Sequence, residues 1–231
     1  MIDERTAGAL ESTARLENIR DLVFPLIKGK RLLDIGSIGH DYEWRKKIGT
    51  FYFAEFHTIA AVVRGIDILE DHVERARKDG YQVVVGDAET FLEENHYDVI
   101  FAGELIEHLS NPGHFLRCAY RNLTATGVLV LTTPNAFSLS RLAKCFAALT
   151  NEPPVNPEHT CYFTPRTLRQ LVTRENFVVQ QLYYVDYDYG QWPWPFWKTA
   201  FLKINSFLSA ALPKLSQSFV VVLAKSAPSL N

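Results

Sequence analysis

The sequence predicts an α/β fold, doubly wound, with a mainly parallel sheet of seven strands. Short β-branched runs alternate with segments of helical periodicity along most of the chain, which is typical of repeated strand–helix–strand units. The strand runs are almost continuously apolar, as expected when helices cover both faces of a parallel sheet. A length of 231 residues suits one large domain with a single core.

The elements follow in chain order. Apolar residues at helical spacing predict one amphipathic helix that ends near Gly29, and they are Leu16, Ile19, Leu22, Val23, Leu26 and Ile27. The seven strands are expected at 31–36, 61–67, 81–87, 97–103, 127–134, 177–185 and 218–225. Helices are expected between them at 68–80, 112–123, 137–149 and 165–176. Thr164 and Pro165 suit the N-cap and the first residue of the last of these helices.

Composition narrows the class of protein. Lysine and arginine number 24 against 26 acidic residues, for a net charge of −2 and no basic run, which disfavours a nucleic-acid-binding protein. The three cysteines are isolated from one another, which disfavours a zinc ribbon or a disulfide framework. The first residues lack an apolar signal core, and no run reaches the ~18 apolar residues of a membrane span, so we expect a cytoplasmic protein.

Acidic residues close or follow four of the predicted strands: Asp34, Asp67, Asp87 and Glu104. Ligands of open parallel sheets bind outside the carboxyl ends of the strands. Glycines in the first turn, Gly36 and Gly39, let a ligand approach the backbone, and an acid that ends the second strand can accept bonds from two ribose hydroxyls. The ordered series therefore predicts a nucleoside pocket.

Between Lys30 and Lys225 these residues resemble the class I S-adenosylmethionine-dependent methyltransferases, of the type 11/12-like kind. The resemblance implies an enzyme with a Rossmann-like fold, an antiparallel last strand beside the sixth, and S-adenosyl-L-methionine as cofactor. The resemblance also implies the cofactor contacts. Asp34, Gly36 and Gly39 would meet the amino-acid part, Asp67 the ribose and Asp87 the adenine amino group, with Ile68 and Ala88 along the ring and Glu104 in the pocket wall.

Two features depart from the family pattern. The loop DIGSIGH lacks the usual DxGxGxG spacing, and the segment 40–60 is longer than the usual connection, which predicts an extra helix or loop over the cofactor mouth. A nicotinamide dehydrogenase is the rival hypothesis, because a glycine loop and an acid after the second strand serve both classes. The absence of GxGxxG and the turn GDAE at 86–89 favour the methyltransferase.

Glu104, Glu107 and His108 have the spacing i, i+3 and i+4, so they are expected on one helical face at the cofactor edge. With His159 they resemble the divalent-metal site of quinone-biosynthesis O-methyltransferases and of RNA 2′-O-methyltransferases. Oxygen and imidazole ligands suit Mg or Mn, which would act as a Lewis acid. Two alternatives stay open: His108 or His159 as a catalytic general base without metal, or residues without a chemical role.

The hypotheses for function follow in order. The leading one is O-methylation of a small-molecule acceptor such as a sugar, a quinone or a lipid-linked intermediate. The others are an RNA 2′-O-methyltransferase, although nucleic acid is disfavoured as a partner by the charge, and a cofactor-binding domain without catalysis.

We expect one methyltransferase domain, 1–231, with an N-terminal helix (1–29), a cofactor-binding core (30–187), an aromatic helical insertion (188–216) and a last strand with tail (217–231). The insertion includes Trp192, Trp194, Phe196 and Trp197. It suits a helical cover, an acceptor pocket, or a peripheral membrane or dimer contact through 192–212.

Overall fold

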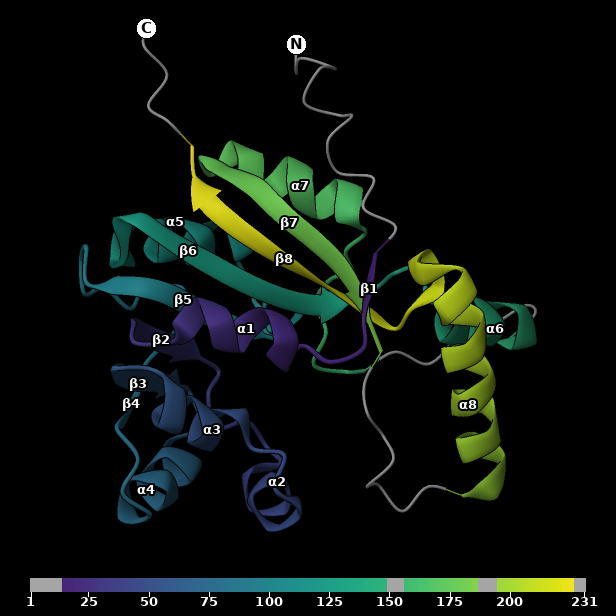
Figure 1. The fold of residues 1–231 in the computed structure, drawn as a ribbon, viewed down its shortest axis with the longest axis horizontal. Helices are drawn as coiled ribbons and strands as arrows, with labels where there is room; N and C mark the ends of the chain where they lie inside the picture. Colours follow the sequence, from purple (N-terminus) through teal and green to yellow (C-terminus); the bar gives the residue numbers. More distant parts are fainter. Residues whose placement is uncertain (1–13, 149–155, 187–194, 227–231) are drawn as a thin grey trace, which may run out of the picture.

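The computed structural model describes residues 14–148, 156–186 and 195–226. Its sheet has eight strands in the order β1-β7-β8-β6-β5-β2-β3-β4 (Figure 1). The strands are β1 Arg15–Leu16, β2 Arg31–Ile35, β3 Val62–Asp67, β4 Val83–Val85, β5 Tyr97–Gly103, β6 Leu123–Pro134, β7 Phe177–Val185 and β8 Ser218–Lys225. Strand β8 is antiparallel to β6 and β7, whereas every other pair is parallel. The predicted α/β class and the antiparallel last strand are therefore confirmed.

Helices cover both faces of the sheet. The helices of the described residues are α1 Arg20–Ile27, α2 Tyr42–Ile48, α3 Tyr52–Ile59, α4 Glu70–Lys78, α5 Pro112–Asn122, α6 Leu139–Ala148, α7 Pro165–Arg174 and α8 Phe196–Ala211, with short 3-10 turns η3 Ile106–His108 and η4 Pro213–Leu215. Because successive side chains of a strand point to opposite faces, Leu33 and Ile100 pack in the cluster with α5 and α7. Leu32 and Val99 pack in the other cluster with α1, α3 and α4.

The expectation of a single N-terminal helix is wrong. Part of that segment forms strand β1, so the sheet has eight strands rather than the seven that were predicted. Arg15 and Leu16 pair in parallel with Tyr184 and Val185 of β7, and α1 begins only at Arg20. An unpaired edge of β7 would leave its backbone groups without partners. Pairing that edge outweighs the helical periodicity of the segment.

The long connection 40–60 forms two helices, as an extra element there was expected. Helix α2 starts directly after the glycine loop, at Tyr42. Helix α3 instead packs on a face of the sheet, because Phe53 and Phe56 are fully buried in the core. Tyr42 of α2 is buried in the same cluster, so both helices of the insertion are part of the packed structure, and a place over the cofactor mouth stays a prediction.

Side chains of the glycine loop and of α3 pack closely against the backbone of Gly65 in β3. A Cβ atom built there would lie 2.5 Å from Ser37 Oγ and 2.6 Å from Phe53 Cζ. We expect Gly65→Ala to lower the free energy of unfolding by about 1–3 kcal/mol, as overpacking does, measured by urea denaturation. Gly86→Ala is the matched control, since its nearest neighbours would lie at 3.4 Å. Equal stability of the two variants would contradict the packing argument.

Within the three described ranges, no helix combines the length and the apolar composition that crossing a bilayer requires.

Candidate active site

The loop after β2 is held by a carboxylate from the neighbouring strand. Asp67, the last residue of β3, is 5% exposed. Its Oδ2 accepts hydrogen bonds from the backbone N–H groups of Ile38 and Gly39, both at 2.9 Å, and its Oδ1 accepts one from Leu69 at 3.0 Å. Gly36 and Gly39 have positive φ angles of 73° and 66°, which favour glycine. Asp67 therefore orders the glycine loop, and its contact with a ribose stays a prediction.

Asp34 lies beneath this loop and is 4% exposed. Burial raises the pKa of its carboxyl well above the usual value, the charge of Asp67 raises it further, and Arg45 opposes this only in part. A positively charged ligand group nearby would stabilise the ionised form. Asp34 thus suits the charge of an ammonium group, and the contact with the amino-acid part of S-adenosylmethionine that the resemblance implies stays a prediction.

Three residues expected around the adenine follow β3 and β4. Ile68 comes directly after β3 and its side chain is 69% exposed, which is high for isoleucine. Ala88 is buried, and Asp87 is exposed with Oδ1 accepting the Glu89 N–H at 2.8 Å. An exposed apolar side chain at this edge suits a flat ring that would cover it.

The glutamates and histidine after β5 are not on consecutive turns of an α-helix, so that expectation is wrong. Glu104 has a positive φ of 50°, and its N–H is held by the Thr132 carbonyl and hydroxyl oxygens at 3.1 and 2.9 Å. The chain then makes only the 3-10 turn η3. Helix α5 starts later, at Pro112, because Asn111 caps it and proline suits its first position.

The turn nevertheless brings three of the four predicted metal ligands together. One ligand atom each from Glu107, His108 and His159 lies within 4.8 Å of the other two. The two imidazole rings are 4.6 Å apart between centroids. Glu104 is outside this group, although it is close enough for its charge to act on Glu107. We call Glu107, His108 and His159 the Glu–His–His cluster.

Glu107 is the most buried member, with no exposed side-chain surface. Its Oε2 accepts a hydrogen bond from the Thr133 hydroxyl at 3.0 Å, whereas its Oε1 is buried and has no hydrogen-bond partner among the described residues. The Nδ1 of His159 is also buried and without one. Buried polar atoms without partners are rare in folded proteins, and an ion that binds there is one explanation.

Burial sets the protonation of the cluster. It raises the pKa of Glu107 to about 8, with Glu104 as the second cause. It lowers the pKa of His108, and together with the positive charges of His108 and Arg141 it lowers the pKa of His159 to about 4. Both imidazoles are therefore neutral near pH 7, and neutral imidazole is the form that binds metals or accepts a proton.

The segment that carries His159 is fastened to η3 by backbone contacts. The N–H of Thr160 donates to the Glu107 carbonyl at 2.8 Å, and its hydroxyl is shared between the Leu109 carbonyl at 2.7 Å and the Glu107 carbonyl at 3.0 Å. Glu158 lies between two histidines, 3.4 Å from His40 Nε2 and 4.0 Å from His108 Nδ1. Sequence reasoning did not single out Thr133, Glu158 or His40, because only the tertiary fold brings them to the cluster.

A glycine loop braced by the acid of β3, together with a polar cluster after β5, is the arrangement expected of a class I S-adenosylmethionine-dependent methyltransferase. Residues 9–182 match a family model described as a methyltransferase domain. The chain belongs to this family and is an S-adenosylmethionine-dependent methyltransferase. The dehydrogenase alternative is thereby excluded.

A curated relative is 27-O-demethylrifamycin SV methyltransferase of Amycolatopsis mediterranei (strain S699), 30% identical over 138 residues. The match covers 56% of this chain and 47% of the relative, so the chain spans about half of that protein's length.

Among solved structures, a SAM-dependent methyltransferase from Archaeoglobus fulgidus is similar at a TM-score of 0.57 and 22% identity, over 90% of this chain and 91% of that one. One from Aquifex aeolicus has a TM-score of 0.56 and 16% identity, over 90% and 88%. At these identities the structures support the fold alone.

Proposed function

We propose that this enzyme methylates a hydroxyl oxygen of a small molecule and that it uses a divalent cation, Mg²⁺ or Mn²⁺, held by the Glu–His–His cluster. The observation that carries the proposal is the convergence of Glu107, His108 and His159 within 4.8 Å. Within the described part of the chain, Oε1 of Glu107 and Nδ1 of His159 have no hydrogen-bond partner, and this supports the proposal because a cation bound to both atoms would satisfy them. One carboxylate and two neutral imidazoles are ligands that Mn²⁺ accepts, and Mg²⁺ would fill its remaining positions with water.

The residues of the protein need to contribute little to the chemical step itself. S-Adenosylmethionine supplies an electrophilic methyl group, so the protein mainly aligns the acceptor and excludes water. A divalent cation would supply Lewis-acid catalysis by lowering the pKa of the acceptor hydroxyl. Ionised Glu107 would balance the charge of the cation, and the Thr133 hydroxyl orients the Glu107 carboxylate through a hydrogen bond. Without a cation, neutral His108 or His159 would be the candidate base.

The small-molecule acceptor is favoured over RNA on two grounds. The relative from Amycolatopsis is named for 27-O-demethylrifamycin SV, so its name indicates methyl transfer to an oxygen of a small molecule. The net charge of −2 and the lack of basic runs offer no electrostatic footprint for a phosphate backbone.

Transfer of labelled methyl groups tests the class of acceptor. Purified enzyme with methyl-labelled S-adenosylmethionine and Mn²⁺ would be incubated with catechols, quinols, hydroxylated polyketides and glycosides, and separately with single-stranded and transfer RNA. We expect label on an oxygen of a small molecule. Label on RNA alone, or on nitrogen or carbon of the small acceptors, would contradict the proposal.

The raised pKa of Glu107 makes metal binding depend on pH. With a pKa of about 8, Glu107 is mostly protonated at pH 7 and must lose its proton to bind a cation. Mn²⁺ affinity should therefore rise by about tenfold per pH unit up to about pH 8 and then level off. His159, with a pKa of about 4, is already neutral over this range. Calorimetric Mn²⁺ titrations between about pH 6 and pH 9 measure the effect, and an affinity independent of pH would contradict it.

A further inference from the structure

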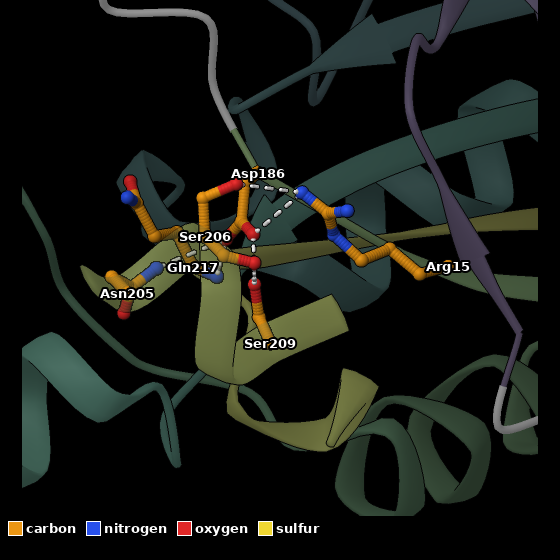
Figure 2. A network of polar contacts seen from close by, with 6 residues as sticks. All are labelled: Arg15, Asp186, Asn205, Ser206, Ser209 and Gln217. Carbon is orange, nitrogen blue, oxygen red and sulfur yellow. Dashed lines mark hydrogen bonds and ion pairs between the residues drawn. The ribbon is translucent and has the colours of Figure 1, made fainter. Parts of the chain in front are cut away.

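Helix α8 packs against the protein through polar side chains. Asn205 and Ser209 are buried, and with Ser206 they face the network of Arg15 and Asp186 (Figure 2). A surface helix normally buries its apolar face and exposes its polar one. The inward face of α8 is thus the opposite of what packing alone would select.

The network fixes the orientation of α8 by joining this helix to β1, to the residue after β7 and to the residue before β8. Asp186, which follows β7, accepts bonds from the Ser209 hydroxyl, from Asn205 Nδ2 at 3.3 Å and from the Gln217 N–H at 2.8 Å. Arg15 of β1 pairs with Asp186 at 3.2 Å and donates to the Ser206 hydroxyl at 3.2 Å. Charged hydrogen bonds within a buried setting are the strong ones. Helix α8 therefore cannot turn its apolar side inward without breaking them.

The outward face of α8 is apolar. Ile204, Phe207 and Leu208 are spaced i, i+3 and i+4, so they share one face, and they are 57%, 77% and 37% exposed. Phe196, in the first turn, is 88% exposed. Large apolar side chains gathered on one exposed helical face mark a site of contact with another molecule or with a membrane.

Helix α6 begins where α8 ends. Asn135, just after β6, donates from Nδ2 to the carbonyls of Lys214 and Ser216 and from its N–H to the carbonyl of Gln217. Figure 1 shows both helices at the end of the sheet to which β6 points. Phe137 and Phe146 add exposed aromatic rings, at 62% and 79%. We call Phe137, Phe146, Phe196, Ile204, Phe207 and Leu208 the α6–α8 patch.

Every charged residue in these two segments is positive. Residues 135–148 and 196–217 contain no aspartate or glutamate, and they contain Arg141, Lys144, Lys198, Lys203 and Lys214. Of these, Lys144, Lys203 and Lys214 are exposed, although the whole chain has a net charge of −2, so exposed positive charge accompanies the exposed apolar side chains of these two segments. Apolar side chains beside lysine and arginine are typical of segments that lie on anionic membrane surfaces.

We propose that the α6–α8 patch docks the enzyme peripherally on a membrane surface that contains anionic lipids. The aromatic and aliphatic side chains would enter the boundary between headgroups and acyl chains, and the lysines would lie against lipid phosphates. A second copy of the chain fits the patch less well, because a two-fold contact would bring the same positive charges together. The proposal does not depend on the metal or on the acceptor.

Sedimentation with lipid vesicles tests the proposal on the full chain. Wild type should bind vesicles of phosphatidylglycerol and phosphatidylcholine, bind pure phosphatidylcholine much more weakly, and be released by high salt. The double variant Ile204→Ser/Phe207→Ser should lose about tenfold or more in partitioning, and Lys203→Glu should lose binding to the anionic vesicles. Unchanged affinity for S-adenosylmethionine shows that the variants are folded.

Matched controls replace exposed residues elsewhere. Val62→Ser/Val178→Ser changes two side chains that are each 45% exposed, and Lys78→Glu makes the same charge change on α4; both should bind vesicles like wild type. The proposal is overturned if the wild-type protein does not bind anionic vesicles or binds neutral ones equally well. It is overturned as well if the control variants lose vesicle binding as much as the patch variants do. It is also overturned if the patch variants instead convert a dimer to a monomer.

Discussion

Asp67→Ala is expected to weaken binding of S-adenosylmethionine by roughly tenfold to a hundredfold, since a hydrogen bond to a charged group contributes about 1.5–3 kcal/mol. The loss has a source within the protein itself. Without the carboxylate, the N–H groups of Ile38, Gly39 and Leu69 lose their acceptor, and the glycine loop is no longer held in one conformation. A bond to the ribose, where it forms, would add to the effect. Titration calorimetry measures the affinity.

Asp98→Ala separates a role at the cofactor site from general stability. Asp98 lies at the amino end of β5, away from the glycine loop, and its Oδ2 accepts the Arg31 N–H at 3.0 Å. Its replacement should lower the melting temperature but leave cofactor affinity unchanged. Asp67→Asn keeps one acceptor oxygen, so its affinity for S-adenosylmethionine should lie between those of wild type and Asp67→Ala. Wild-type affinity in a folded Asp67→Ala protein would remove this residue from the cofactor site.

The strands that were predicted to the residue are those with strong local signals. Residues 97–103, 177–185 and 218–225 are observed as β5, β7 and β8 with the same bounds. Each consists mostly of apolar or β-branched side chains and is flanked by residues that do not continue the pattern. Strand β1 has two residues, and its pairing depends on the free edge of β7, so no local pattern could reveal it. Whether such a short strand forms depends on contacts between residues that are distant in sequence.

The sequence singled out three residues that the fold brings together, but it predicted the wrong backbone geometry for them. The spacing of Glu104, Glu107 and His108 predicted an α-helical face, but the left-handed backbone at Glu104 and the late start of α5 at Pro112 replace the helix with a 3-10 turn. His159 meets this turn because Thr160 binds the Glu107 carbonyl. The orientation of α8 was also beyond sequence reasoning, since it rests on Asp186. Trp192 and Trp194 lie outside the described residues.

Removal of divalent metal is expected to abolish methyl transfer to the acceptor, and added Mg²⁺ or Mn²⁺ to restore it, while cofactor affinity stays near that of wild type. Glu107→Gln keeps the shape of the side chain but removes the charge that balances the cation. Thr133→Val removes the hydrogen bond to Glu107 Oε2, and loss of such an outer partner typically costs about 10–100-fold in metal affinity. We expect Glu107→Gln to lose more Mn²⁺ affinity and more activity than Thr133→Val. His159→Ala should lose about as much of both as Glu107→Gln. Calorimetry with Mn²⁺ and activity on the acceptor provide the two measurements.

Glu94→Gln is the matched control for the charge change, because Glu94 is exposed, pairs with Arg121 and precedes β5 at its amino end. It should bind Mn²⁺ and transfer methyl groups like wild type. Acceptor and metal should also strengthen each other's binding by the same factor if both occupy the cluster, because such coupling is reciprocal. Full activity after exhaustive chelation, with no metal found by elemental analysis, would reject the metal and leave neutral His108 or His159 as the base. In that case activity would fall as the responsible histidine gains a proton at low pH, and added metal would not restore it.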